Sequence, residues 1–371
     1  MSQRKCAILF AGGGTGGHLY PAIAIADEVK KRSPEAELLF IGTKGKIEAR
    51  VVPQRGYRFA AIRITGFRRE LSLRTLLFPF TVVVAVAQSF VLIRKFRPDV
   101  VVGTGGYVCG PPVFVATLLR IPTLIQEQNS YPGITTRLLA RRVTQVHITF
   151  ESSRRYLKRT DNVTLSGNPV REAIGSLSRD EGCRFFGIAP DKRVLLVVGG
   201  SLGAASINRA VLAILHDLAR LGAQVIWATG LQDHAAIERS VTSLASEVRS
   251  VVRLHPFIEK MEYALAACDL AICRAGASTL AELMQAGVPA ILIPYPYAAA
   301  DHQTENARAM VNQEAAVMCN DNEIGRMLLT TITELLGDSA RLKTMAENAR
   351  LLSKPRAAET LAEAILQLAQ V

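Results

Sequence analysis

The sequence lacks the residue patterns that hold disulfide scaffolds and common metal sites. Its six cysteines include no Cys-x-x-Cys pair, and most of them lie in apolar runs. No His-Glu-x-x-His segment and no Asp-x-Asp pair occurs anywhere. These absences exclude the usual zinc motifs and argue against a diphosphate site bridged by a metal ion. We therefore expect a reduced, cytosolic protein with no metal and no cofactor.

Aromatic residues are also scarce, at 6% of the chain, and Trp227 is the single tryptophan. No basic run is interleaved with aromatic residues, so binding of single-stranded nucleic acid is weakly supported. The net charge of +12 still indicates an anionic partner, and charge alone does not choose among a nucleotide, a lipid phosphate, a membrane surface and nucleic acid. The apolar content of 49% and the length of 371 residues predict a globular protein of two domains. An apolar strand starts within a few residues of the N-terminus, so we expect no signal peptide.

One uncharged run, from Thr75 to Ile93, is close to the length that spans a bilayer. Pro79 and Gln88 interrupt it, and an apolar strand begins just after Pro98. The run therefore stands where a crossover helix between two parallel strands belongs, and we expect a buried or interfacial helix instead of a spanning one.

Short apolar strands alternate with helices along the whole chain, which is typical of parallel α/β sheets. Strands are predicted at Cys6–Ala11, Leu38–Ile41, Val100–Val102, Pro122–Gln126, Arg193–Val198, Gln224–Ala228, Val251–Leu254, Leu270–Cys273 and Ala290–Ile293. Helices are predicted at Pro21–Lys31, Ala205–Leu218 and Arg356–Val371. Both halves open with a strand, a glycine loop and a helix. We predict two Rossmann-like domains, at residues 1–165 and 166–355, and a C-terminal helix at 356–371 that packs back on the first.

The first glycine loop, Gly12–Gly17, precedes His18. It does not fit a dinucleotide site, because the second strand ends in Ile41-Gly-Thr-Lys44 without an acid. It does not fit a P-loop either, because His18-Leu19 stands in place of Lys-Ser/Thr. A helix N-terminus disfavours imidazolium, so His18 is expected to be neutral and able to act as a general base. The alternative is a histidine that only caps the helix.

The second half carries an apolar strand that runs into Arg274-Ala-Gly-Ala-Ser-Thr-Leu-Ala-Glu282. Small residues at a helix start let backbone N–H groups approach a phosphate, and a carboxylate one turn later suits a ribose diol. Ser201, in the loop Gly199–Ala204, and Arg171 would add to a diphosphate site, and Gln303 suits sugar hydroxyls. The alternatives are an ordinary strand–turn–helix, a surface arginine and a helix capped by Asp301.

Taken together, these motifs resemble the MurG-type family, the UDP-N-acetylglucosamine:N-acetylmuramyl-(pentapeptide)-pyrophosphoryl-undecaprenol N-acetylglucosamine transferases of peptidoglycan synthesis. The resemblance covers nearly the whole chain. Seven segments fall in the family's order: Gly13–His18, Gly103–Tyr107, Gln126–Asn129, Gly167–Arg171, Gly199–Gly203, Arg274–Glu282 and Asp301–Gln303.

The resemblance implies a two-domain GT-B fold, with the donor UDP-GlcNAc mainly on the C-terminal domain. It implies His18 as the base, with Glu127 as a helper. Ser201 and Arg171 would contact the diphosphate, Ile258 the uracil, Glu282 the ribose and Gln303 the sugar. The surrounding turn would be Ala277, Ser278, Thr279, Leu280, Ala281 and Glu282, and the first domain would add Thr15, Gly16, Gly17 and Asn129.

We therefore expect an inverting transfer of GlcNAc to the C4 hydroxyl of MurNAc in lipid I, which gives lipid II and UDP. A peripheral enzyme on the cytoplasmic face of the inner membrane is expected, with roles in cell wall biogenesis, cell shape and division. Basic and apolar residues at Phe67–Arg69, Arg74 and Leu76–Phe80 suit shallow insertion beside anionic lipid; the alternative is a loop packed on its own domain. Two other functions stay open: another UDP-sugar enzyme of this fold, such as a glycolipid synthase or UDP-GlcNAc epimerase, and a non-catalytic nucleotide-sugar-binding module.

Overall fold

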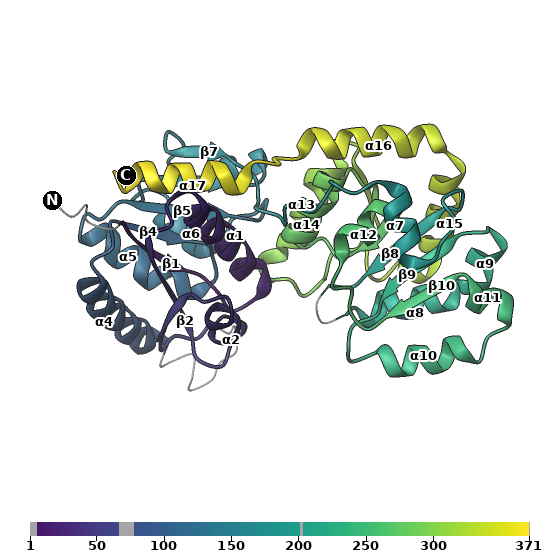
Figure 1. The fold of residues 1–371 in the computed structure, drawn as a ribbon, viewed down its shortest axis with the longest axis horizontal. Helices are drawn as coiled ribbons and strands as arrows, with labels where there is room; N and C mark the ends of the chain where they lie inside the picture. Colours follow the sequence, from purple (N-terminus) through teal and green to yellow (C-terminus); the bar gives the residue numbers. More distant parts are fainter. Residues whose placement is uncertain (1–5, 67–77, 201–202, 371) are drawn as a thin grey trace. The chain divides into compact units, whose positions relative to one another are not determined.

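The structure is a computed structural model that describes residues 6–66, 78–200 and 203–370. The chain forms two compact units (Figure 1). Unit 1 comprises Met1–Val170 and Lys354–Val371, and unit 2 comprises Arg171–Ser353. The division lies between Val170 and Arg171, a few residues beyond the end of the last strand of the sheet of unit 1.

Unit 1 is built on a 7-stranded parallel sheet of order β3-β2-β1-β4-β5-β6-β7. Its strands are β1 (Ala7–Ala11), β2 (Glu37–Thr43), β3 (Arg58–Ile62), β4 (Val100–Gly103), β5 (Thr123–Glu127), β6 (Gln145–Ile148) and β7 (Val163–Leu165). Its helices are α1 (Gly16–Arg32), α2 (Ile47–Gln54), α4 (Phe78–Phe96), α5 (Gly110–Leu118), α6 (Ile134–Leu139) and α17 (Ala357–Leu368), with 3-10 turns η1 (Tyr107–Cys109) and η2 (Glu151–Tyr156).

Unit 2 is built on a 6-stranded parallel sheet of order β10-β9-β8-β11-β12-β13. Its strands are β8 (Val194–Val198), β9 (Gln224–Ala228), β10 (Val252–His255), β11 (Leu270–Cys273), β12 (Ala290–Leu292) and β13 (Ala316–Met318). Its helices are α7 (Arg179–Phe186), α8 (Ala205–Ala213), α9 (Leu215–Arg220), α10 (His234–Thr242), α11 (Ser246–Ser250), α12 (Met261–Ala267), α13 (Ala277–Ala286), α14 (His302–Val311), α15 (Ile324–Gly337) and α16 (Ser339–Leu352), with the 3-10 turn η3 (Ala299–Asp301).

The strand order reverses once in each sheet, and this point locates the sites. In unit 1 the first strand lies between β2 and β4, and in unit 2 the corresponding strand β8 lies between β9 and β11. Open parallel sheets bind ligands outside the carboxyl ends of the two strands at such a reversal. The loops that follow β1, β4, β8 and β11 are therefore the expected ligand-binding loops.

The predicted α/β architecture of two parallel-sheet domains is confirmed, and the predicted strands fall within a residue or two of observed ones. The short strands β3, β6, β7 and β13 were not predicted from the sequence. Its single helix at Ala205–Leu218 is wrong, because Ile214 leaves the helical conformation and separates α8 from α9.

Alternation along the strands gives unit 1 a core on each face of its sheet. Ile8 and Phe10 face the layer that contains α1, whereas Leu9 and Ala11 face the layer that contains α4 and α5. Helix α17 belongs to the first layer, where Leu361 and Ile365 are completely buried beside residues of α1. The C-terminal helix is therefore part of unit 1.

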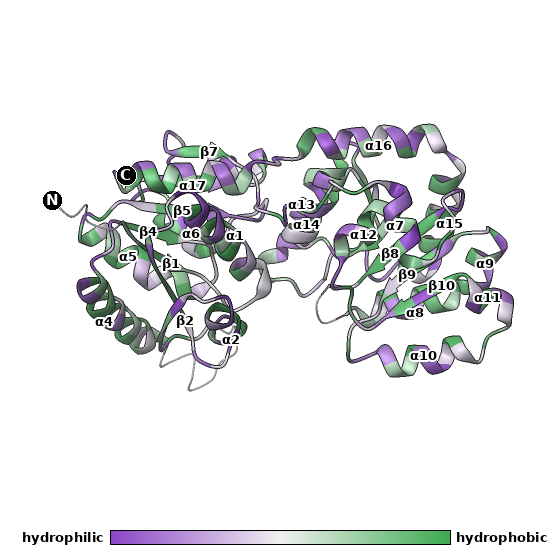
Figure 2. Ribbon diagram, in the orientation of Figure 1, coloured by the Kyte–Doolittle hydropathy of each residue, from purple (hydrophilic) through white to green (hydrophobic). Residues whose placement is uncertain are grey.

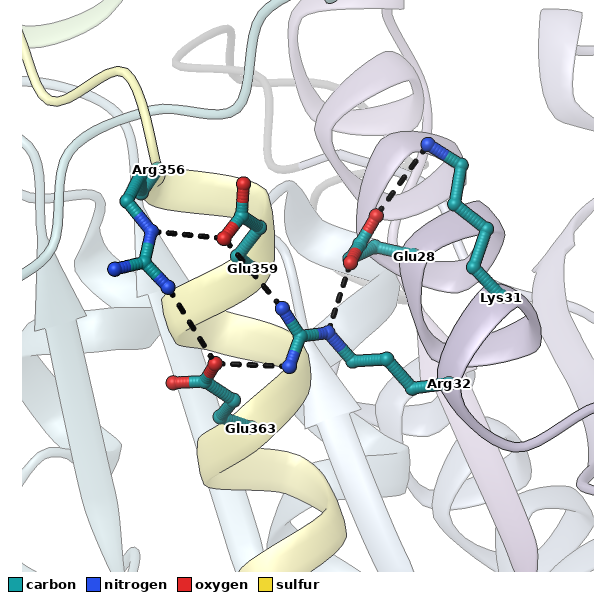
Figure 3. Close-up of polar contacts among 6 residues, drawn as sticks. All are labelled: Glu28, Lys31, Arg32, Arg356, Glu359 and Glu363. Carbon is teal, nitrogen blue, oxygen red and sulfur yellow. Dashed lines mark hydrogen bonds and ion pairs between the residues drawn. The ribbon is translucent and has the colours of Figure 1, made fainter.

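An ion-pair network lies along the contact of α17 with α1 (Figure 3). The guanidinium of Arg32 donates to Glu28 at 2.8 Å, to Glu363 at 2.8 Å and to Glu359 at 3.5 Å. Arg356 also pairs with Glu359, at 2.8 Å. All these groups are solvent-exposed to some degree, so the buried apolar contact contributes more to stability than they do.

Helix α4 is the crossover between β3 and β4, and few of its residues are buried. Only Ala85, Ser89 and Ile93 are buried, where α4 packs on α5 and β3. Phe80 is 68% exposed and Val83 is 64% exposed. By length and composition alone, the helix is long and apolar enough to span a membrane (Figure 2). Only 17% of its apolar stretch is buried. The sequence predicted a buried or interfacial helix, and the low burial of α4 rules out the buried form.

Candidate functional site

The site residues of unit 1 gather where β1, β4 and β5 end. Helix α1 begins at Gly16, directly after the first glycine loop, and Thr15 and Gly17 are exposed at its start. No side chain caps this helix start and its first turn contains no acid, so the N–H groups of Gly16 and Gly17 have no partner among the described residues. His18 lies in that first turn and is partly exposed.

The ring of His18 is held by residues that follow β4 and β5. Its Nδ1 lies 2.8 Å from Oε1 of Gln128, whose side chain is only 2% exposed. The hydroxyl of Thr104 donates to the backbone carbonyl of His18 at 2.9 Å. Among the described residues, no hydrogen-bond partner of His18 Nε2 occurs. One nitrogen of the ring is therefore fixed by the protein, and the other is open.

Two glycines of the segment Gly103–Tyr107 make room for this ring. A Cβ on Gly105 would stand 2.6 Å from Nδ1 of His18, and a Cβ on Gly106 would stand 2.6 Å from the carbonyl of Gly13. Both have positive φ, at 97° and 75°. Only glycine fits these positions without displacing His18 or the first glycine loop.

The carboxylate of Glu127 braces a loop instead of contacting His18. Oε1 accepts from the backbone N–H of Asn129 at 3.1 Å and from its side-chain amide at 3.2 Å. Oε2 accepts from Gly133 N at 3.0 Å and from the Thr136 hydroxyl at 2.6 Å. With four donors on a side chain that is 3% exposed, Glu127 holds Asn129 and the start of α6 in place.

An internal carboxylate stands behind the first glycine loop. Glu48, on α2, is buried and accepts from Gly14 N at 3.0 Å, while its other oxygen accepts from the backbone and hydroxyl of Thr43. The sequence reading found no acid at the end of the second strand, and the acid comes instead from the following helix. It binds the loop's own amide, so this N–H is not available to a ligand phosphate.

In unit 2, helix α13 begins directly after β11, at the reversal of the sheet. Its N-cap residue, Gly276, provides no side-chain cap. Ser278, in the first turn, has a buried hydroxyl without a hydrogen-bond partner among the described residues. Ala277, Leu280 and Ala281 are buried, so these three present mainly backbone to any ligand. An open helix N-terminus with an unpartnered hydroxyl is suited to an anion.

Two of the residues predicted to bind UDP-GlcNAc contact each other. Arg171 lies 3.5 Å from Glu282 and 3.6 Å from Glu262, and it donates to the carbonyl of Glu259 at 3.0 Å. Burial raises the pKa of Glu282; Glu262 raises it further and Arg171 opposes the shift. Ile258, also buried, lies in the loop that provides Glu259. The structure thus brings Arg171, Ile258 and Glu282 to one place in unit 2.

Gln303 lies in the first turn of α14, and its side-chain carbonyl accepts from Tyr295 N at 3.0 Å. The amide nitrogen has no partner among the described residues. Ser201 lies outside the described residues.

The sequence reading assigned no role to the Arg274 side chain, which is largely buried. It donates to Asp321 at 2.5 Å, to Ser206 at 2.8 Å and to the carbonyls of Ile293 and Pro294. These bonds tie the loop after β11 to the loops after β12 and β13 and to α8. A lone arginine before a small-residue turn carries no signal for such a role.

Comparison with known proteins agrees with this two-unit arrangement. Residues 8–148 match the glycosyltransferase family 28 N-terminal domain, and residues 194–361 match the family 28 C-terminal domain. Among solved structures, MurG from Acinetobacter baumannii is 28% identical, with a TM-score of 0.78 over 98% of this chain and 99% of that one. A glycosyltransferase from Rickettsia africae, 11% identical with a TM-score of 0.63 over 98% and 99% of the two chains, shares the fold.

Two bacterial relatives named UDP-N-acetylglucosamine–N-acetylmuramyl-(pentapeptide) pyrophosphoryl-undecaprenol N-acetylglucosamine transferase align over nearly their full lengths. The one from Chlorobaculum tepidum is 46% identical over 98% of this chain and 99% of its own. The one from Salinibacter ruber is 43% identical over 100% and 98%. The chain therefore belongs to this family of UDP-GlcNAc-dependent glycosyltransferases.

Proposed function

We propose that this protein transfers GlcNAc from UDP-GlcNAc to the C4 hydroxyl of MurNAc in lipid I, giving lipid II and UDP. The observation that carries this proposal is sequence identity of 46% and 43%, over nearly the full length, to relatives named for that transfer. This similarity favours the transfer reaction over a glycolipid synthase, an epimerase or a binding module, because those alternatives are supported by the shared fold alone.

Unit 2 would bind the donor. The open N-terminus of α13, the Ser278 hydroxyl and Arg171 supply hydrogen-bond donors and positive charge for a diphosphate. The carboxylate of Glu282 would accept from the ribose hydroxyls, and the free amide of Gln303 would donate to the sugar. Arg171 pairs with Glu282 in the structure; a diphosphate would offer Arg171 a more highly charged partner.

Unit 1 would supply the base. His18 would take the proton of the C4 hydroxyl as that oxygen attacks the anomeric carbon of the α-linked donor and UDP leaves. Attack from the face opposite UDP gives a β-1,4 bond, so the transfer is inverting. The open N–H groups of α1, near Thr15, Gly16 and Gly17, and the amide of Asn129 would hold polar groups of the acceptor.

The test is a transfer assay with radiolabelled UDP-GlcNAc and a short-chain lipid I analogue. We expect label to appear in a lipid-linked disaccharide, and an acceptor that lacks the C4 hydroxyl should take up none. Epimerised UDP-sugar without transfer would instead indicate the epimerase. Donor binding without any turnover would indicate the binding module.

We also propose that α4 seats the protein on the cytoplasmic face of the membrane. Its exposed Phe80, Val83, Phe90 and Val91 offer apolar surface, and Arg94 and Lys95 end the helix with positive charge. A spanning helix does not fit, because β3 and β4, which α4 connects, lie in one sheet and Ser89 and Ile93 pack into its core. Of the predicted membrane segment Phe67–Phe80, residues 67–77 lie outside the described residues.

Vesicle co-sedimentation tests whether α4 binds the membrane. The wild type should sediment with anionic vesicles and be released by salt, whereas V83E/V91E should stay in the supernatant. The control L221E/L351E adds the same charge at exposed leucines of unit 2 and should bind like wild type. Equal binding of both double variants would contradict the proposal.

A further inference from the structure

We propose that Gln128 is a positioning residue that selects the reactive tautomer of His18. The inference rests on the proposed role of His18 as base. It concerns which ring nitrogen carries the proton in the neutral imidazole, since only the unprotonated nitrogen can accept one.

The orientation of the Gln128 amide is set by its surroundings. Its Nε2 donates to the backbone carbonyl of Thr104 at 2.8 Å and to that of Gln126 at 3.1 Å. It also meets the side-chain oxygen of Gln126. A flipped amide would set Oε1 against these three acceptor oxygens in a buried site, with no hydrogen between them. The nitrogen therefore faces the carbonyls.

This orientation directs Oε1, which only accepts, toward the ring. Oε1 lies 2.8 Å from His18 Nδ1, so Nδ1 must donate and carry the proton. In the neutral ring the lone pair then lies on Nε2, the nitrogen without a partner among the described residues. The base nitrogen is thus Nε2, and the amide of Gln128 keeps it unprotonated and accessible.

The surrounding backbone keeps the ring from turning away from this bond. The positions where Gly105 and Gly106 would carry a Cβ are 2.6 Å from Nδ1 and 3.4 Å from Cδ2 of His18, so both edges of the ring lie close to the chain. Thr104 fixes the backbone carbonyl of His18 and also accepts from Gln128. Ring, amide and loop therefore form one connected arrangement.

The chain contains a matched control for the loss of a buried amide. Asn162, also in unit 1, donates from Nδ2 to the carbonyls of Ala140 and Val143, both at 3.0 Å. Its Oδ1 is buried and has no hydrogen-bond partner, histidine or other, in the part of the chain that the structure describes. N162L therefore removes the same kind of buried carbonyl bonds as Q128M, without the contact to His18.

The first measurement uses the unaltered protein. In the full chain labelled with ¹⁵N-histidine, the His18 signals are assigned by their loss in H18A. At a pH at which the ring is neutral, we expect its single proton to be on Nδ1. A wild-type ring protonated at Nε2 would overturn the proposal, whether or not any variant folds.

The second measurement compares the variants. In Q128M we expect His18 to populate both tautomers and kcat to fall by about 10- to 100-fold, less than loss of the base itself, with KM for UDP-GlcNAc nearly unchanged. N162L should keep the single tautomer and most of its kcat. A single Nδ1-protonated tautomer in Q128M, or an unchanged kcat, would overturn the assignment. Turnover that survives in H18A would instead refute the base, while the tautomer result would stand.

Discussion

At the scale of residues, the described part of the candidate sites contains two kinds of polar side chain: those whose polar atoms all bond within the protein, and those that keep one atom without a partner. Glu127 and Glu48 are saturated by donors from their own unit, whereas His18 and Ser278 each keep an atom without a partner among the described residues. Groups of the second kind are available to a substrate.

The first prediction concerns His18. H18A should lower kcat by about 10²- to 10⁴-fold, the usual contribution of a general base, and leave KM for UDP-GlcNAc within about twofold. Steady-state kinetics on the lipid I analogue measure both. H216A, at an exposed position of α9, is the control. A kcat close to wild type in H18A would remove His18 from the mechanism.

The second prediction concerns the donor. E282Q keeps the size of the side chain and removes the charge that would accept from the ribose, so KM for UDP-GlcNAc should rise by roughly 10-fold or more. Titration calorimetry with UDP should show the same loss. E247Q, on the exposed surface of α11, should bind UDP as wild type does; equal binding by E282Q would refute the ribose contact.

The third prediction concerns His147, which is buried between Ser166 and Gln145. Burial lowers its pKa from 6.5 to about 4. The folded state therefore binds fewer protons than the unfolded state between these values, and stability falls as the pH drops through that window. We expect protonation of His147 in the unfolded state to lower the free energy of unfolding by about 2 kcal/mol between pH 7.5 and pH 5.

Urea unfolding at the two pH values measures this cost. H147Q keeps a hydrogen-bonding side chain but does not titrate, so its stability should depend less on pH, while exposed H216Q should behave like wild type. An unchanged pH dependence in H147Q would contradict the prediction.

The sequence predicted His18 as a base beside the first glycine loop, because a glycine run between a strand and a helix lets a ligand approach closely; the role of His18 stays a prediction. The sequence did not identify Gln128 or Glu48. Gln128 contacts His18, and Glu48 contacts the first glycine loop, only because the fold brings the end of β5 and α2 beside that loop. Contacts between distant segments leave no local pattern.

At the scale of elements, α17 shows which interaction holds a helix to its unit. Leu361 is fully buried against α1, whereas Arg32 and its partners lie at the surface (Figure 3). Burial of a leucine contributes more than a solvated ion pair.

The fourth prediction follows from this difference. L361A should reduce the free energy of unfolding of unit 1 by about 2–4 kcal/mol, whereas R32A should have a much smaller effect. Urea denaturation of the full chain provides the comparison. A larger loss in R32A than in L361A would show that the ion pairs dominate.

Elements with a clear apolar run were predicted well, and short edge strands were not. β7 has three residues, of which only Val163 is buried, and β3 is buried only at Ile62. Their pairing with inner strands makes them strands, and the sequence does not show that pairing.

At the scale of the whole molecule, two separate parallel sheets account for the length and composition of the chain. All six cysteines lie buried within these units. Burial raises the pKa of Cys109 and of Cys273 to about 12, so neither forms a thiolate near neutral pH.

The fifth prediction uses these thiols to report on folding. In the native protein, iodoacetamide at neutral pH should modify essentially none of the six, and in denaturant it should modify all of them. Mass spectrometry counts the adducts. Rapid native labelling of Cys109 or Cys273 would contradict the burial described above.

The position of α17 also determines when unit 1 is completed during synthesis. The ribosome makes β1 and α1 before unit 2, but the helix that covers them is made only after unit 2. Until α17 is made, the apolar side of α1 that receives Leu361 and Ile365 stays uncovered. A nascent chain stalled near Ser353 would carry a finished second half beside an incomplete first one, which makes it a substrate for chaperones that bind exposed apolar helices.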